Sequence, residues 1–185
     1  MKKFLLLVLV AFVSSTMSAQ LVTSTTITKK QSPEKSYTFM EAGVGTLGGD
    51  IKNDGISLDL GFGYRKEYTQ YLAWDILKIK AIAEISNLED TLTPQLMTGV
   101  RGTSPVLFGN VTGYASFSIG YGHNIKGECG GLAYEAQIGL NLTSKLSLGL
   151  VYDNQSLSYE EEDELIDEKF NYNVSFTGIR LGLRF

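Results

Sequence analysis

The chain has 185 residues, 43% of them hydrophobic and 19% charged, with a formal net charge of −4 at pH 7. This size and composition fit one folded domain and exclude an intrinsically disordered chain. A single cysteine excludes an internal disulfide framework and a zinc site built on cysteines. The acidic charge balance, without a basic cluster, argues against a nucleic-acid partner.

The N-terminus has the layout of a secretory signal peptide. A positive segment, residues 1–3, precedes an apolar run at 4–13 and a stretch of small residues that ends at Ala19. We therefore expect cleavage after Ala19, so that residues 1–19 are a signal peptide. The alternative, an uncleaved membrane anchor, would need about 20 apolar residues. Residues 20–35 are polar and aperiodic, and they predict a flexible periplasmic N-terminal tail.

From residue 36 onward, apolar residues recur at every second position, which is typical of half-buried strands. The alternation is clear in five segments: 56–65, 111–121, 134–141, 146–153 and 178–185. It is weaker in three others: 38–44, 71–83 and 92–101. The segment 71–83 also has apolar residues at helical spacing, but its neighbours favour a strand. The sequence thus predicts eight strands.

The segments between these strands differ in length. Residues 66–68 and 142–144 predict tight turns, whereas 45–55, 86–91, 122–131 and 158–169 predict longer polar loops. The link at 102–109 is apolar and of medium length. Tight turns at one end and long loops at the other are typical of outer-membrane barrels. We therefore predict an all-β fold, an eight-stranded antiparallel up-and-down transmembrane β-barrel, over residues 36–185.

One face of the predicted strands is apolar, and the other is rich in Gly and Ser and carries charges. A soluble periplasmic barrel, the alternative, would place its apolar face inside. In a membrane barrel of eight strands the charged face fills a narrow lumen, where opposite charges should pair. We expect the arginines toward the tight-turn end and most carboxylates from mid-height upward. The predicted lumen charges are Glu41, Asp59, Arg65, Asp75, Arg101, Glu135, Asp153, Arg180 and Arg184.

Aromatic residues lie near the predicted strand ends, as in the girdles at membrane interfaces. The chain stops within a strand, with apolar residues at Ile179, Leu181, Leu183 and Phe185. This ending resembles the C-terminal signal of small Gram-negative outer-membrane β-barrel proteins, and residues 140–148 are similar to the periplasmic hairpins of that family. The resemblance implies an outer-membrane location and recognition of the last strand by the barrel-assembly machinery. It also implies contact with outer-membrane lipid and lipopolysaccharide.

Catalytic and metal-ligating patterns are weak. Some small barrels are lipid A enzymes that use a Ser with a His, but Ile125 stands two residues after the single histidine, His123. Ser118 could approach His123 only through the fold. His123, Glu128 and Cys129 share one loop without a metal-binding spacing. We assign no catalytic residue, metal or cofactor.

An acidic segment lies in the last predicted loop. Such a segment is typical of a solvated hairpin tip, or it could hold a divalent cation that bridges to lipopolysaccharide phosphates. Its acids are Glu160, Glu161, Glu162, Asp163, Glu164, Asp167 and Glu168. We predict a structural or surface-interaction role through the extracellular loops, with a plugged lumen. The alternative is a narrow pore for small or hydrophobic solutes.

Overall fold

The computed structural model describes residues 35–50, 55–163 and 166–185, with side chains described outside 159–171. The expected signal peptide, and the expected tail up to residue 34, lie outside the described residues. Residue 35, expected to end the tail, is the first residue of the first strand, one position before the expected start of the barrel.

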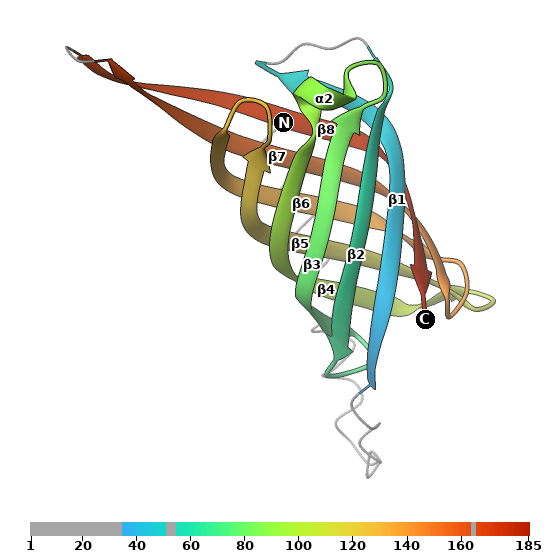
Figure 1. Cartoon of the computed structure of the whole chain (residues 1–185). Coiled ribbons are helices and arrows are strands. Elements are labelled where there is room, and N and C mark those ends of the chain that lie inside the picture. The colour runs from blue at the N-terminus through green and yellow to red at the C-terminus, as the bar shows by residue number, and fades with distance from the viewer. Residues whose placement is uncertain (1–34, 51–54, 164–165) are drawn as a thin grey trace, which may run out of the picture. The chain divides into compact units, whose positions relative to one another are not determined.

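Eight antiparallel strands follow one another around a closed barrel, and the last strand pairs with the first (Figure 1). The predicted fold class is confirmed, including the ambiguous segment 71–83, which is β3. A four-residue helix, α2 (Leu88–Thr91), interrupts one connection. The strands are β1 (Lys35–Gly49), β2 (Ser57–Glu67), β3 (Leu72–Glu84), β4 (Thr93–Phe108), β5 (Val111–Asn124), β6 (Cys129–Asn141), β7 (Leu146–Asp163) and β8 (Ile166–Arg184).

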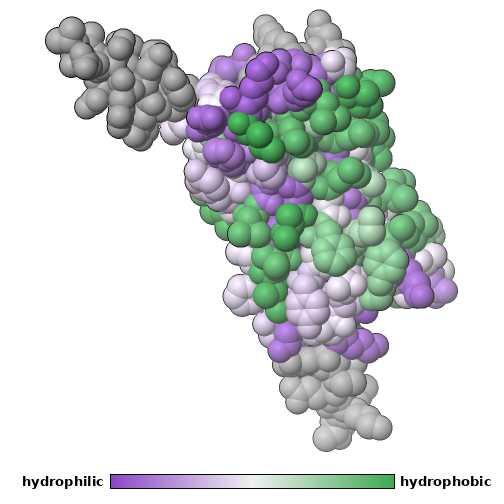
Figure 2. Space-filling view, viewed as in Figure 1, coloured by the Kyte–Doolittle hydropathy of each residue, from purple (hydrophilic) through white to green (hydrophobic). Residues whose placement is uncertain are grey.

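The outward face of the barrel wall is apolar. Figure 2 shows hydrophobic side chains covering a broad area of the visible wall, with hydrophilic ones gathered toward both ends. Large apolar side chains are exposed on every strand, among them Leu60, Leu96, Leu132, Leu150 and Ile179. The buried side chains of the same strands are largely charged or polar. This is the pattern of a barrel whose wall faces lipid. Among the described residues, no helix is long and apolar enough to cross a membrane.

A β-bulge in β3 shifts the alternation by one residue. Ile76 and Leu77 are both exposed, while Asp75 before them and Lys78 after them are both buried. The pairing register shifts at the same place against both neighbouring strands. A bulge adds one residue to one strand of a pair. It turns Lys78 and Lys80 into the lumen, where strict alternation from Asp75 would turn them out.

The bulge is held by a side chain from β4. The Thr98 hydroxyl donates a hydrogen bond to the backbone carbonyl of Asp75 (2.8 Å) and accepts one from the Trp74 indole (2.8 Å). Because an unpaired carbonyl in an apolar environment is costly, this contact stabilises the irregular backbone.

The connections differ from the sequence-based expectation. The apolar link expected at 102–109 is mostly strand, because β4 continues to Phe108 and turns into β5 through Gly109 and Asn110. Gly109 has a φ of 55°, which suits glycine at such a turn. Much of the expected loop segments 45–55, 122–131 and 158–169 is also strand, so neighbouring strands remain paired beyond the predicted limits.

The polarity of the wall inverts toward the long-loop end. Along β7 the outward positions change from Leu148, Leu150 and Tyr152 to Asn154 and Ser156. The inner face also carries a buried apolar cluster, which on β7 includes Val151 below Asp153 and Leu157 above it, together with Leu47, Ile82, Cys129, Val174 and Phe176. Along β7 and β8 the outward positions are therefore apolar below this change and polar above it, whereas Leu132 on β6, opposite Ser156, remains an exposed apolar residue. We call this change the inversion level.

Candidate functional site: the barrel lumen

Seven buried charges form one connected set at mid-height in the lumen, here called the lumen network: Glu41, Asp59, Lys78, Lys80, Glu135, Asp153 and Arg180. Arg180, on β8, lies at its centre. The guanidinium donates hydrogen bonds to Glu41 (3.1 Å), to Glu135 (2.7 Å) and to Asp59. These three carboxylates come from β1, β6 and β2, so one arginine joins strands around the barrel.

Two lysines complete the network from β3. Lys78 Nζ lies 2.6 Å from Glu41 and 2.7 Å from Glu135. Lys80 Nζ lies 2.6 Å from Glu135 and 3.1 Å from Asp153. Removing one member of such a buried set leaves its partners unpaired, at a typical cost of about 3–5 kcal/mol.

Two glutamines extend the network toward the long-loop end. The Gln95 and Gln155 amides donate to Asp153 at 3.0 and 3.4 Å. A single carboxylate therefore accepts from two neutral donors in addition to Lys80. Leu157 of the buried apolar cluster is the next inward residue beyond Gln155 on β7.

Arg65 and Asp75 form a pair nearer the short-turn end, and Arg65 Nη2 also lies 4.0 Å from Glu41 of the lumen network. Their side chains make two hydrogen bonds, one of them between Nη2 and Oδ2 at 2.8 Å. The expected position of Asp75, from mid-height upward, is wrong, because β3 starts at residue 72 and Asp75 pairs in register with Arg65. Arg180, expected at the tight-turn end, reaches the carboxylates at mid-height.

Arg101 is buried at the short-turn end, and the pairing expected for it is not observed. It makes no ion pair with any carboxylate in the described part of the chain. Its guanidinium carbon lies 3.4 Å from the ring centroid of Tyr114, and its Nη2 donates to Asn141 (2.7 Å). An aromatic face and an amide thus replace the expected carboxylate.

Glycines make room for the ring beneath Arg101. Tyr114, on β5, is 1% exposed, and its ring extends past Gly139 on β6 to Gly149 on β7. A Cβ atom at Gly149 would collide with the Tyr114 hydroxyl, and one at Gly139 would lie 2.9 Å from its ring. The Gly-rich inward face therefore serves packing in a narrow interior.

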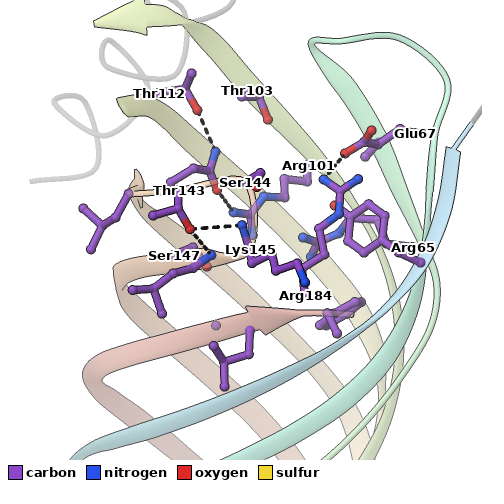
Figure 3. Close-up of a pocket in the computed structure, with 18 of the residues that line it drawn as sticks. Arg65, Glu67, Arg101, Thr103, Thr112, Thr143, Ser144, Lys145, Ser147 and Arg184 are labelled. Atoms are coloured by element: carbon purple, nitrogen blue, oxygen red, sulfur yellow. Dashed lines mark hydrogen bonds and ion pairs between the residues drawn. The ribbon is translucent and has the colours of Figure 1, made fainter. Parts of the chain in front are cut away.

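A cavity of about 480 Å³ opens beside Arg101 at the short-turn end (Figure 3). Its lining includes Arg65, Arg101, Lys145 and Arg184. Arg184, placed in the lumen by its alternation, is only partly buried. It pairs with Glu67 (2.9 Å), and both side chains keep about a third of their surface exposed, 32% and 28%. We call this space the short-turn cavity.

The structure does not bring the weak catalytic and metal candidates together. His123 is exposed on the outer face of β5, whereas Ser118 is buried on the inner face of the same strand. Glu128 is exposed, while Cys129 is buried against Tyr172. Among the described residues, no three His, Cys, Asp or Glu side chains form a group that could hold a metal.

At the long-loop end, α2 is tied to the β5–β6 turn. Lys126 donates to the Asp90 carboxylate, and this hydrogen bond lowers the pKa of Asp90 below its usual 3.8. Asn124 Nδ2 donates to the Asp90 backbone carbonyl (3.1 Å). Two of the expected surface loops therefore support each other.

β7 and β8 continue past their neighbours as a two-stranded ribbon. They pair up to Asp163 and Ile166, whereas β6 pairs with β7 only to Ser158 and β1 pairs with β8 only to Val174. Figure 1 shows this ribbon extending beyond the rest of the barrel. The acidic residues at 160–163 and 167–168 lie on it, whereas Glu164 and all the acidic side chains, and so the possible cation site, lie outside what the structure describes.

Several lumen residues were not predicted from the sequence: Lys78, Lys80, Gln95, Tyr114 and Gln155. The two lysines were missed because of the bulge: alternation counted from Asp75 would place them on the outward face, toward lipid. Alternation does place Gln95 and Gln155 on the polar face, so their positions in the alternating pattern could have identified them.

Comparisons with known proteins support the fold. No protein-family model matches the sequence, and no curated protein matches it. Among solved structures, the crystal structure of Neisserial surface protein A aligns with a TM-score of 0.51 at 9% identity, covering 83% of this chain and 100% of that chain. The chain has the fold of the small outer-membrane β-barrels.

Two further small barrels align with lower scores. Ail, the attachment invasion locus protein of Yersinia pestis, crystallised with the heparin analogue sucrose octasulfate, has a TM-score of 0.43 at 15% identity, over 82% of this chain and 98% of that chain. The outer membrane protein AlkL, solved by solid-state NMR in lipid bilayers, has a TM-score of 0.42 at 9% identity, over 88% and 96%.

The last strand of this outer-membrane barrel fold closes the barrel by pairing with β1. Three apolar residues of the suggested assembly signal, Ile179, Leu181 and Leu183, are exposed on its outward face, and the fourth, Phe185, is exposed directly after the strand. They lie where lipid or an assembly partner could contact them.

Proposed function

We propose that this protein is a non-enzymatic barrel of a Gram-negative outer membrane that acts as a scaffold or surface-interaction protein through its long-loop end. In this proposal a signal peptide cleaved after Ala19 exports the chain, and the barrel-assembly machinery inserts it through the C-terminal strand. Lipid contacts the apolar wall, and lipopolysaccharide surrounds the long-loop end.

The lumen network is the observation that carries the proposal, since it supports a closed interior. Its charges belong to β1, β2, β3, β6, β7 and β8, and each side chain is at most 4% exposed. An eight-stranded barrel leaves an interior just wide enough for side chains to fill. A solute crossing at this level would have to separate buried ion pairs at a cost of several kcal/mol.

The features at the long-loop end support a surface role. The tie between α2 and the β5–β6 turn gives this end a preformed shape, and the β7–β8 ribbon carries the acidic segment away from the wall. The separation of His123 from Ser118 on opposite faces of β5 favours a non-enzymatic role over a lipid A enzyme.

Planar-bilayer conductance measurements test whether the lumen is closed to ions. We expect the refolded wild-type chain to insert without discrete current steps. The double variant Lys80→Ala/Glu135→Ala removes one cation and one anion from the centre of the lumen network, and we expect it to conduct in small steps. His123→Ala, on the outer face, is the matched control and should stay silent.

Discrete current steps from the wild-type protein would contradict closure and support the alternative, a narrow pore. The short-turn cavity is the observation that favours this alternative, because it already provides about 480 Å³ of the path.

A further inference from the structure

We propose that the short-turn cavity binds a soluble, phosphate-sized oxyanion, with Arg101 as the main ligand and Lys145 at the entrance. This site is independent of whether the lumen conducts, because it lies on one side of the lumen network.

The buried cation is the first argument. Arg101 is 5% exposed and makes no ion pair in the described ranges. A guanidinium has five N–H donors, and the contacts found for Arg101 are one hydrogen bond, to Asn141, and a ring stacked against its flat face. Because the Tyr114 ring contacts its face, the guanidinium keeps the N–H groups on its edge available to donate hydrogen bonds. Such a fork matches the oxygen atoms of phosphate and carboxylate groups.

Local charge is the second argument. Arg65 and Arg184 also line the cavity, but each has its own carboxylate, Asp75 and Glu67 respectively. Lys145 lies in the β6–β7 turn, is exposed, and has no ion pair among residues whose side chains are described. Arg101 and Lys145 therefore leave this end of the lumen positive, and opposite charge would collect there.

The lining also favours a small polar ligand. The cavity volume of about 480 Å³ lies within the range of roughly 300–1,000 Å³ found for ligand sites. Hydroxyl groups of Thr103, Thr112, Thr143 and Ser147 border it, and they can donate to oxygen atoms that the arginine does not reach. Figure 3 shows these hydroxyl-bearing side chains around the same space as Arg101 and Lys145.

The fixed geometry of Arg101 adds selectivity. Asn141, which accepts from Arg101, itself donates to Thr112 (2.9 Å), so β4, β5 and β6 together hold the guanidinium. A preformed site of this kind binds with less loss of side-chain freedom than a mobile surface lysine. The ligand enters from the short-turn side, because the lumen network lies beyond the cavity.

Titration with inorganic phosphate tests the proposal, using the full chain refolded in a non-ionic detergent at constant ionic strength in a chloride background. We expect saturable binding to one site by isothermal titration calorimetry. Arg101→Gln should weaken the affinity at least tenfold, and Lys145→Gln by about threefold. Lys126→Gln, an exposed lysine at the opposite end, is the matched control and should bind phosphate as the wild type does.

A heat-dependent gel shift establishes that each variant is folded. If Arg101→Gln does not fold, the phosphate affinity of the exposed Lys145→Gln variant tests the proposal instead. Acetylation of lysine residues in the Lys126→Gln background should likewise weaken phosphate binding. The proposal is overturned if the wild-type protein shows no saturable binding, or if phosphate binds equally to the folded Arg101→Gln or Lys145→Gln variants. Equal loss in Lys126→Gln would also overturn it, since binding would then follow total charge.

Discussion

At the scale of single residues, a buried charge in this barrel depends on the partners that surround it. Arg180 contacts carboxylates from three strands and has no exposed side-chain surface. Arg184, four residues later on the same strand, faces one carboxylate and remains partly exposed. Both alternate inward, yet only the first is shielded from water. Loss of a partner from a shielded ion pair strongly lowers the stability of the fold, whereas exposed ion pairs contribute little to it.

Replacing Arg180 by Met should therefore destabilise the barrel by about 3–5 kcal/mol, because Glu41, Asp59 and Glu135 lose a shared cation. Arg184→Met, the matched control, should cost about 0–1 kcal/mol. Urea unfolding in lipid vesicles, followed by tryptophan fluorescence, measures both values. A similar loss of unfolding free energy in the two variants would show that burial does not determine how much these ion pairs contribute to stability.

At the scale of elements, the bulge in β3 decides which side chains reach the lumen. Ile76 and Leu77 share the outward face, so the alternation before the bulge and the alternation after it are out of phase. Without this irregularity, Lys78 and Lys80 would face lipid, and Glu135 would lose both of its lysine partners.

Two deletions in β3 separate the bulge from the alternation. Deleting Leu77 removes the extra residue and leaves Asp75 and Lys78 on the inner face, so we expect a folded barrel. Deleting Ile79 turns Lys80 toward lipid, at a cost of about 2–4 kcal/mol near the midplane, and breaks its contacts with Glu135 and Asp153. We expect this variant not to fold, as judged by the heat-dependent gel shift. If the Leu77 deletion does not fold and the Ile79 deletion does, the register shift does not lie at Ile76 and Leu77.

The sequence predicts strands better than it predicts their irregularities. Period-2 alternation identifies all eight strands, because the wall separates lipid from a polar lumen along most of its length. The bulge has no such signal, since Ile76 and Leu77 are ordinary apolar residues. The contact of Arg101 with Tyr114 also escapes prediction, because it depends on the pairing register of β4 and β5, which shifts between Thr103 and Phe108 without a signal in the sequence.

At the scale of the whole barrel, the polarity of the outward side chains along β7 and β8 predicts contact with two different solvents. Below the inversion level, the outward positions are apolar and the interior holds the lumen network. Above it, β7 presents Asn154 and Ser156 outward while Leu157 is buried. Tyr134, which pairs in register with Asn154, and Tyr152 lie at this change, with ring centroids 6.4 Å apart. Aromatic residues favour the membrane interface, so we expect the inversion level to mark where β7 leaves the bilayer.

Fluorescence quenching by lipids with brominated acyl chains tests this account most directly. With Trp74, the single native tryptophan, replaced by Phe, one new tryptophan is placed at Leu150 or at Ser156. Both positions face outward on β7, about 20 Å apart along the strand. We predict strong quenching of Leu150→Trp and little quenching of Ser156→Trp. Equal quenching at both positions, or none at either, would contradict a wall that is immersed in lipid below the inversion level and in water above it.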